Sequence, residues 1–295
     1  MRTTTDLVTS ESCLLADGPW GSEFLRMGLQ PGSSPEQWNL LHPEKVLRVA
    51  QDYVEAGARV ILTNTFGGNS FRLARHNLKC ALDEINRRGA EISREAAGDR
   101  ALVFGSMGPT GKLLAMRKVS EADVFSAFRQ QADSLSQGGV DALLIETMGE
   151  LQELRAAARA AREVCSLPLV LSMTFDSGND KTRTMMGVTP EQAVDEMQKL
   201  DAWMVGANCG IGPEFCVNVC KRMRAVTSKP IWVKPNAGLP SVIDGRVVYA
   251  QTPEIFGPFA LLLREAGANV IGGCCGTTPD HIRHMSRFLA MESGL

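Results

Sequence analysis

The sequence predicts an α/β fold, a single barrel of the TIM (β/α)8 type that spans residues 1–295. Short apolar runs alternate with amphipathic segments of helical periodicity, and this alternation continues to a count of eight. The predicted strands are apolar almost throughout, as in parallel sheets whose two faces are both covered. A length of 295 residues also suits one barrel domain.

An open, doubly wound sheet is the alternative fold for such an alternation. That fold usually carries a Gly-x-Gly-x-x-Gly turn after its first strand, where the glycines admit a dinucleotide phosphate. The segment Asp17-Gly18-Pro19-Trp20-Gly21 does not have this pattern. The barrel is therefore the favoured interpretation.

The first four strands are expected where apolar runs end at polar or glycine-rich residues, at 13–18, 59–63, 101–106 and 141–146. A long loop rich in Gly, Pro and Ser should follow the first strand as far as Ser34. Helices are expected at 43–56, at roughly 70–97 and from Ser120 to about 138. Ser120 is suited to cap its helix, and Asp123 places an acid in the first turn.

The second half continues the same alternation. Strands are expected at 168–174, 202–207, 230–234 and 268–271, and helices at 150–164, 190–200, 213–226, 253–266 and from 280 onward. Thr189 should cap the helix that Pro190 begins, since proline suits the first helical position. Residues 235–252 are expected to form a longer loop.

Composition excludes several classes of protein. The net charge of −2 leaves no electrostatic footprint for nucleic acid or an anionic membrane. No apolar run approaches the ~20 residues that span a bilayer, and the N-terminus lacks the apolar core of a signal peptide. A cytoplasmic location is therefore expected. In such a reducing compartment, eight cysteines favour metal binding or catalysis over disulfides.

Polar residues gather at the C-terminal ends of the predicted strands, where TIM barrels carry their active sites. These residues are Asp17, Asn64, Thr65, Glu146, Asn208, Cys209, Asn236, Cys274 and Cys275. Three cysteines from distant parts of the chain should thus meet on one rim. The other five cysteines fall at the start of a strand or on helices.

Three thiolates form a soft ligand set that suits Zn²⁺, and three protein ligands leave a fourth position open, as in catalytic sites. Such an ion is a weak Lewis acid, but it can hold a bound thiol as a nucleophilic thiolate. Alkyl transfer to sulfur is the natural reaction. Taken alone, Cys274-Cys275 is also compatible with buried packing or with a vicinal disulfide.

The segment Gly272-Gly273-Cys274-Cys275-Gly276-Thr277, together with Asn208-Cys209, closely resembles the homocysteine S-methyltransferases. The resemblance covers nearly the whole chain. The segments 63–67, 108–111 and 235–240 look most like the methionine-synthase branch. The resemblance implies a zinc-bearing TIM barrel whose three metal ligands are Cys209, Cys274 and Cys275, and which converts homocysteine to methionine.

The resemblance also implies positions for the substrate. The ammonium group of homocysteine would lie near Asp17 and Glu146, and Asn236 matches an oxygen ligand of the metal in the absence of substrate. Charge-assisted hydrogen bonds from an ammonium to carboxylates agree with this. Gly18, Asn64, Thr65 and Asn208 are further candidates for substrate contact. The alternative is that Asp17 begins a turn and Glu146 caps a helix.

The family's full-length methionine synthases carry folate and cobalamin modules, which this sequence lacks. We therefore expect a separate methyl donor, either a methylated corrinoid protein or a small molecule such as S-methylmethionine, S-adenosylmethionine or betaine. Two other hypotheses stay open. One is a non-enzymatic subunit that binds homocysteine or zinc in a corrinoid system, and the other is a metal-free redox enzyme that cycles Cys274-Cys275.

Overall fold

Eight parallel strands form the centre of the computed structural model, which describes residue 8 and residues 13–243 and 246–292. The strands are β1 (Leu14–Leu15), β2 (Val60–Leu62), β3 (Leu102–Met107), β4 (Ala142–Met148), β5 (Leu169–Met173), β6 (Met204–Cys209), β7 (Ile231–Pro235) and β10 (Val270–Ile271). They pair in the order β1-β10-β7-β6-β5-β4-β3-β2. A parallel bridge from Ala16 to Val60 then brings β1 back to β2. The predicted TIM barrel is confirmed, and the open sheet is not.

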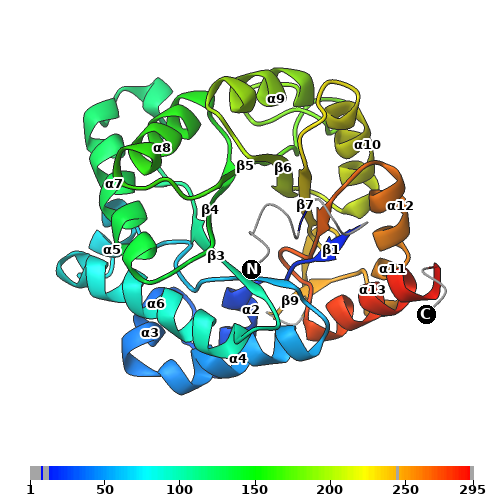
Figure 1. Ribbon diagram of the computed structural model, residues 1–295, viewed down its shortest axis with the longest axis horizontal. Helices are drawn as coiled ribbons and strands as arrows, with labels where there is room; N and C mark the ends of the chain where they lie inside the picture. The colour runs from blue at the N-terminus through cyan, green and yellow to red at the C-terminus, as the bar shows by residue number, and fades with distance from the viewer. Residues whose placement is uncertain (1–7, 9–12, 244–245, 293–295) are drawn as a thin grey trace.

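Helices surround the strands on the outside (Figure 1). They are α2 (Trp20–Arg26), α3 (Trp38–Leu41), α4 (Pro43–Glu55), α5 (Ser70–Ala74), α6 (Leu82–Ala97), α7 (Glu121–Gln137), α8 (Leu151–Val164), α9 (Pro190–Lys199), α10 (Pro213–Arg224), α11 (Pro253–Phe256), α12 (Phe259–Glu265) and α13 (Pro279–Glu292). Short 3-10 turns lie at Pro35–Gln37, Lys79–Ala81 and Leu114–Met116.

The interior of the barrel is built in layers, because side chains on a strand alternate between its two faces. Large apolar residues fill the lower part, and the Trp232 ring stacks on Phe104 with centroids 5.8 Å apart. Two residues further along several strands, the inward face becomes polar. These polar residues are Ser106, Glu146, Ser172, Asn208 and Lys234. The fold thus places a polar layer on an apolar base.

Two predicted helices are broken. The helix expected at 70–97 divides into α5, a 3-10 turn and α6, and Asn77 between them has a φ of 58°. A residue in the left-handed region cannot continue a helix. The helix expected at 253–266 divides into α11 and α12 at Gly257-Pro258. Proline has no N–H to donate to the preceding turn, which accounts for this second break.

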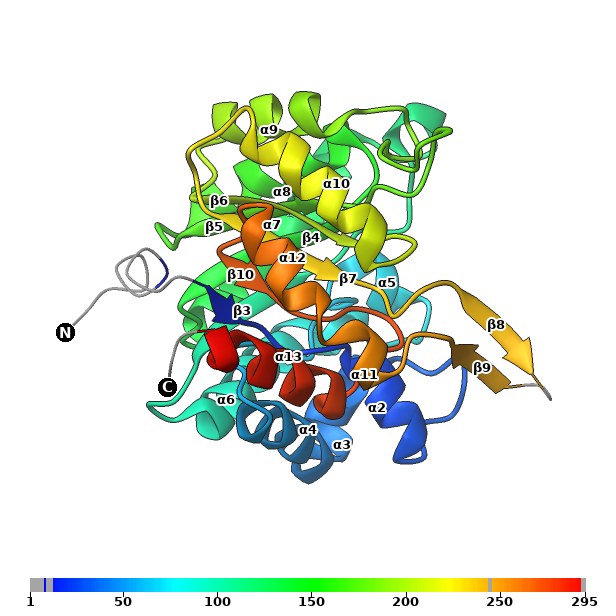
Figure 2. The same cartoon turned by 90° about the vertical axis from the view of Figure 1, so that its right-hand side faces the viewer.

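Two segments expected to be loops contain regular structure. The segment after the first strand forms α2, whose Trp20 and Phe24 are buried. The segment 235–252 contains an antiparallel pair, β8 (Pro240–Ile243) and β9 (Arg246–Tyr249). This hairpin stands away from the barrel at one end (Figure 2). Its valines reach an exposure of 74% at Val242, so short apolar strands are present without a covering layer.

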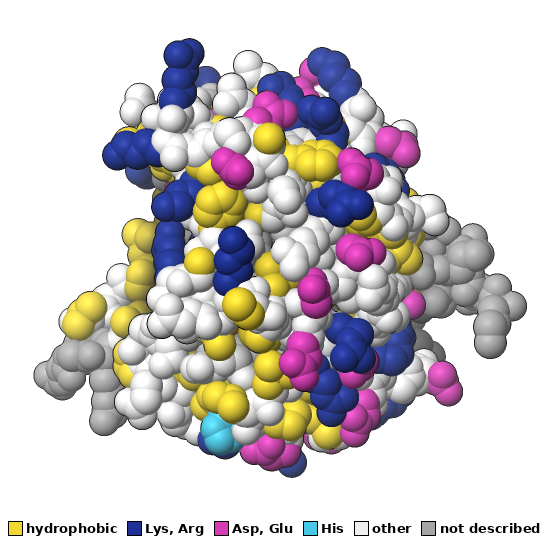
Figure 3. All heavy atoms as spheres, turned by 90° about the vertical axis from the view of Figure 1, so that its left-hand side faces the viewer, with side chains coloured by type: hydrophobic (Ala, Val, Ile, Leu, Met, Phe, Trp, Pro, Cys, Tyr) yellow, Lys and Arg dark blue, Asp and Glu magenta, His cyan; other side chains and the backbone are white. Residues whose placement is uncertain are grey.

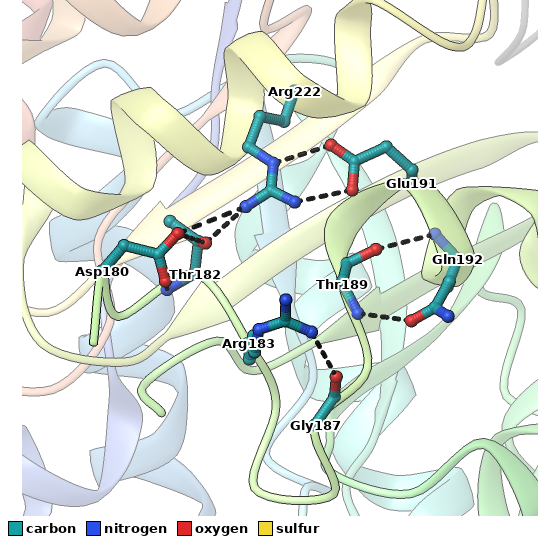
Figure 4. A network of polar contacts seen from close by, with 8 residues as sticks. All are labelled: Asp180, Thr182, Arg183, Gly187, Thr189, Glu191, Gln192 and Arg222. Atoms are coloured by element: carbon teal, nitrogen blue, oxygen red, sulfur yellow. Dashed lines mark hydrogen bonds and ion pairs between the residues drawn. The ribbon is translucent and has the colours of Figure 1, made fainter. Parts of the chain in front are cut away.

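The predicted helix starts are confirmed. The Ser120 hydroxyl accepts a hydrogen bond from the Asp123 backbone N–H at 3.1 Å. Thr189 and Gln192 form a reciprocal capping box at the start of α9. Beside it, Arg222 of α10 binds Glu191 through two parallel hydrogen bonds of 2.6 and 2.7 Å (Figure 4). The starts of α7 and α9 are therefore fixed by side chains.

The outer surface carries charges of both signs. On the face drawn in Figure 3, Lys and Arg side chains are interspersed with Asp and Glu. Among the helices in the described part of the chain, none has the length and apolar character needed to cross a bilayer.

Candidate metal and thiol-binding site

Three cysteines meet at the C-terminal rim of the barrel, as the sequence predicted. Cys209 ends β6, while Cys274 and Cys275 follow β10, and their three Sγ atoms all lie within 4.8 Å of one another. Within the described ranges, no other group of three or more His, Cys, Asp or Glu side chains is gathered closely enough to hold a metal ion. The rim therefore contains a preformed cluster of sulfur atoms.

The backbone around the cluster is tightly arranged. Cys209 has a φ of 65°, a backbone conformation that residues other than glycine rarely adopt. The Cys274 N–H donates to the carbonyl of Pro235 at 2.7 Å, and the Cys275 carbonyl accepts from the Ala237 N–H at 2.9 Å. These contacts connect the two cysteine segments through the exit of β7. Strain of this kind persists where the surrounding structure fixes it, and it is often found at functional sites.

One of the three clustered thiols, Cys209, differs from the structural cysteines in its proton affinity. Hydrogen bonds from Cys274 and Cys275 hold the pKa of Cys209 well below its ordinary value. The same hydrogen bonds raise the pKa of Cys274 and of Cys275. By contrast, burial raises the pKa of Cys220 on α10 to about 12, which keeps that thiol protonated. Thiolate character is thus concentrated on Cys209, and thiolates are what bind metals.

The side-chain amide of Asn236 lies beside Cys209. Its Nδ2 donates to the carbonyl of Gly210 at 2.5 Å, and its side chain also contacts Cys209 and favours the thiolate. Its Oδ1 is buried and has no hydrogen-bond partner among the described residues. Buried polar atoms are nearly always satisfied, so an atom of this kind is available to a ligand. Three sulfurs and one oxygen fit a borderline-soft divalent metal ion.

A cavity of about 390 Å³ opens beside the cluster. All three cysteines line it, together with Gly18, Asn64, Thr65 and Glu146 among the predicted residues. A Cβ atom at Gly18 would lie 2.6 Å from the Tyr53 hydroxyl, so only glycine fits at this position without a shift of Tyr53. Asp17, Asn208 and Asn236 are not among the residues that line the cavity. The structure therefore gathers seven of the ten predicted residues around one cavity and leaves three outside its lining.

Glu146 is a buried acid that faces the cavity, with 5% of its surface exposed. Its Oε1 accepts a hydrogen bond from the Ser106 hydroxyl at 2.6 Å, and its Oε2 accepts only a long one, 3.3 Å, from Asn208. Burial raises the pKa of Glu146, an effect that the nearby charge of Lys234 opposes. Oε2 thus retains the capacity to accept a hydrogen bond from a ligand in the cavity.

Asp17 lies in a different environment. It is fully buried, and its Oδ2 accepts hydrogen bonds of 2.8 Å from both the Trp20 indole and the Leu62 N–H. Its Oδ1 lies 2.5 Å from Nζ of Lys234, which is also buried. Both oxygens of Asp17 therefore already bond to groups of the protein. Its ion-pair partner Lys234 lines the cavity, and Asp17 itself does not.

The remaining amides and hydroxyls bond to neighbouring strands and, at Asn64, to α3. Asn208 accepts from Ser172 at 2.6 Å and from the Thr147 N–H at 2.9 Å. The amide of Asn64 donates to Asn39 at 2.9 Å, and Thr65 donates to the carbonyl of Ser106 at 2.8 Å. These bonds hold the polar layer in place around Glu146.

Sequence reasoning missed several residues of this cavity. Lys234 and Ser106 belong to the polar layer, and Glu36, Arg72 and His76 also line the cavity. Lys234 had a recognisable signal, because it is a charged residue at the end of an apolar strand. Glu36, Arg72 and His76 lie on segments whose path to the cavity cannot be inferred from periodicity alone.

Comparison with known proteins identifies the family. The protein-family model of the homocysteine S-methyltransferases matches residues 14–289, which is nearly the whole chain. The chain belongs to the homocysteine S-methyltransferase family. This family assignment agrees with the resemblance seen in the cysteine motifs.

Individual members of the family are moderately similar to this chain. Methionine synthase of Mycobacterium tuberculosis is 30% identical over an alignment of 307 positions, which covers 97% of this chain and 25% of that protein. Methionine synthase of Mycobacterium leprae is 31% identical over 265 residues, 85% of this chain and 22% of that protein. The chain thus spans about a quarter of the length of these relatives.

Solved structures of the family share the fold. The homocysteine methyltransferase MmuM from Escherichia coli matches with a TM-score of 0.81 in its oxidised form, at 23% identity, over 95% of this chain and 97% of that one. Its metallated form matches with a TM-score of 0.80 at the same 23% identity. At this level of identity, the match establishes the barrel architecture.

Proposed function

We propose that this protein is a zinc-dependent methyltransferase that moves a methyl group onto the sulfur of homocysteine and so produces methionine. The observation that carries the proposal is the cluster of Cys209, Cys274 and Cys275 at one end of a cavity that also holds a buried, partly unsatisfied carboxylate. Family membership supports the same reaction.

Zn²⁺ bound by these three cysteines would supply a site at which the homocysteine thiol loses its proton at neutral pH. The carbon–sulfur bond of methionine then forms as the bond between the methyl group and its donor breaks. The bonding electron pair stays with the donor. In the absence of substrate, the buried Oδ1 of Asn236 is the protein atom suited to the fourth position.

The protein's own residues orient the substrate. Glu146 would accept hydrogen bonds from the ammonium group of the substrate. Ser106 and Asn208 hold the Glu146 carboxylate in place. Gly18 lines the cavity, and its lack of a side chain lets the backbone pass close to Tyr53. A bound thiol held at a fixed distance from its methyl donor reacts as in an intramolecular reaction, which is the main advantage that such positioning gives.

The proposal places the reaction in a reducing compartment such as the cytoplasm, because the three thiols must stay reduced to bind a metal. The methyl donor in the proposal is a separate molecule. Similarity to methionine synthases and the segment 235–240 favour a methylated corrinoid protein over S-methylmethionine, S-adenosylmethionine or betaine. Methionine formation from homocysteine, measured with each of these donors and with methylcobalamin, would identify the class.

The central test removes one sulfur. Cys209→Ala should lower the zinc content from about one ion per chain to a small fraction and abolish methionine formation, because two thiolates bind zinc far less tightly than three. The matched control is Cys80→Ala, since Cys80 is exposed and does not belong to the cluster. Circular dichroism should be unchanged in both variants.

X-ray absorption at the zinc edge gives an independent readout. The reduced protein should show three sulfurs and one light atom, and selenohomocysteine should replace the light atom by selenium. Full zinc retention in Cys209→Ala would contradict the proposal. So would a zinc coordination shell that does not change when the substrate is added. A disulfide between Cys274 and Cys275 without zinc would indicate the redox alternative, and homocysteine binding without turnover would indicate a binding subunit.

A further inference from the structure

A tyrosine from the hairpin of β8 and β9 lies against the cysteine cluster. Tyr249 ends β9 and pairs with Pro240, at the end of the hairpin opposite its turn. Among the apolar hairpin side chains that the structure describes, Tyr249 is the one that packs against the core, while Val242 and Val247 are exposed. Tyr249 does not line the cavity, and the proposed function gives it no role. Its contact with the cluster therefore requires an explanation.

The Tyr249 ring lies directly on the backbone beside the paired cysteines. Gly276, the residue after Cys275, has a φ of 86°. A Cβ atom at Gly276 would lie 2.5 Å from Tyr249 Cδ1, so only glycine leaves room for the ring here. The Tyr249 hydroxyl hydrogen-bonds to the Cys275 sulfur, and the charges of Cys209 and Cys274 also act on it. The phenol therefore contacts the cluster at one sulfur, that of Cys275.

Hydrogen bonds on two sides hold the end of the hairpin beside the cysteines. The Ala237 N–H donates to the Cys275 carbonyl at 2.9 Å, and the Ala237 carbonyl accepts from the Gln251 N–H at 3.2 Å. From α13, His281 Nε2 donates to the Gln251 carbonyl at 2.9 Å. Gln251 lies two residues beyond Tyr249. These bonds therefore fix the base of the hairpin, and with it the phenol, relative to the cysteine loop.

A hydrogen bond to a metal-binding thiolate has two effects. It fixes the orientation of the sulfur, as outer partners commonly do for metal ligands. It also stabilises the negative charge on the sulfur and so lowers its nucleophilicity. The second effect matters for the proposed reaction. The loaded site would hold three protein thiolates beside one substrate thiolate, and only the substrate should receive the methyl group.

We propose that Tyr249 is a positioning residue that orients the Cys275 thiolate as a metal ligand and keeps it from competing with the substrate for the methyl group. The inference rests on the proposed function, because it concerns the metal-loaded form of the same site. Tyr249 acts through Cys275 and touches neither the substrate nor its cavity.

The test measures how readily each cysteine is methylated. Methyl iodide is added to the zinc-loaded protein at saturating zinc and without homocysteine. A thiolate that reacts forms a sulfur–carbon bond while the carbon–iodine bond breaks, and iodide leaves with the electron pair. Mass spectrometry of peptides gives a separate rate for each cysteine. Tyr249→Phe should raise the rate at Cys275 relative to Cys209 by about tenfold to a hundredfold, the effect of losing one hydrogen bond to a charged group.

Further variants separate the hydroxyl from the ring. Tyr249→Phe should also weaken zinc binding by about tenfold, measured by competition with a chelating indicator. Tyr249→Leu removes the ring as well, and it should match Tyr249→Phe in both measurements. The matched control is Tyr53→Phe, because it removes the other of the chain's two tyrosine hydroxyls, which donates to the Pro19 carbonyl at 2.9 Å. It should leave the zinc affinity and the rate at Cys275 unchanged.

A rate at Cys275 that is unchanged in Tyr249→Phe would overturn the inference. An equal increase at all three cysteines would also overturn it, because that result would indicate a general opening of the site. An increase in Tyr249→Leu alone would refute the role of the hydroxyl and assign the effect to packing of the ring. Failure of the wild-type protein to bind zinc is a different result, because it would contradict the proposed function itself.

Discussion

Glu146 combines burial with incomplete hydrogen bonding, and both properties matter for the substrate. Burial raises its pKa above the ordinary value of 4.5. Only the ionised carboxylate accepts hydrogen bonds from an ammonium on both oxygens. Affinity for homocysteine should therefore be full at neutral pH and should decline as the pH falls through a value higher than that of an exposed glutamate.

This prediction can be measured as the pH dependence of the dissociation constant. Glu146→Gln should weaken homocysteine binding by about tenfold to a hundredfold at neutral pH and remove the acidic limb assigned to this residue. The analogue 4-mercaptobutyrate serves as the control ligand, since it has no ammonium. An acidic limb that persists unchanged in Glu146→Gln would refute the assignment.

At the scale of single residues, the sequence allowed the cysteine cluster to be predicted but not the state of each acid. The cysteines could be found because they follow strands, and parallel strands end on one rim. Which of the two acids, Asp17 or Glu146, is free to bind a ligand depends on Lys234, which forms an ion pair with Asp17. That pairing joins residues at opposite ends of the chain, so local patterns could not reveal it.

At the scale of helices, the pair of α9 and α10 is joined by the two hydrogen bonds between Arg222 and Glu191. These bonds lower the pKa of Glu191 from 4.5 to about 2. A lowered pKa of an acid stabilises the fold above the pKa of the unfolded chain. This contribution is therefore present above pH 4.5 and is lost as the pH falls from 4.5 towards 2.

Arg222→Met should lower the free energy of unfolding at pH 7 by roughly 0.5–1 kcal/mol, a small value because both side chains are about one-third exposed. Urea denaturation at pH 7 and near pH 3 would show the difference from wild type shrinking in acid. Arg129→Met is the matched control, since its single bond to Glu163 joins two half-exposed side chains and should contribute less. A pH-independent difference would contradict this account.

The elements themselves were predictable where chemistry is local. Thr189 and Ser120 signalled helix starts, and apolar runs signalled strands. The breaks at Asn77 and Gly257-Pro258 were missed because the flanking segments share one amphipathic pattern. The hairpin of β8 and β9 was missed because it packs little of its surface, so it has no alternation between buried and exposed residues to detect.

At the scale of the whole molecule, the barrel does not depend on the metal site for its closure. Backbone hydrogen bonds join β1 to β2, with Arg59 N–H donating to Leu15 at 2.7 Å and Asp17 N–H donating to Val60 at 3.0 Å. The apolar layer around Trp232 and Phe104 lies below the cysteines. Stability therefore comes mainly from residues that touch no ligand.

Removal of the metal should accordingly abolish activity and leave the fold. We expect a chelator to leave the far-UV circular dichroism of the protein unchanged and to lower its melting temperature by only the amount that loss of a bound ligand predicts. Zinc should restore activity. Unfolding of the protein on chelation, as in small zinc domains, would show that the cluster holds the barrel together.

The filled base of the barrel also restricts the route by which the substrate and the methyl donor can reach the site. In the described part of the chain, Trp232, Phe104 and their neighbours fill the interior beneath the polar layer, so the thiol must enter through the rim. A methyl donor must approach from that side too and would cover whatever lies deeper. For the proposed reaction this imposes a compulsory order, with homocysteine first on and methionine last off. Methionine should then inhibit competitively against homocysteine, and the demethylated donor should not.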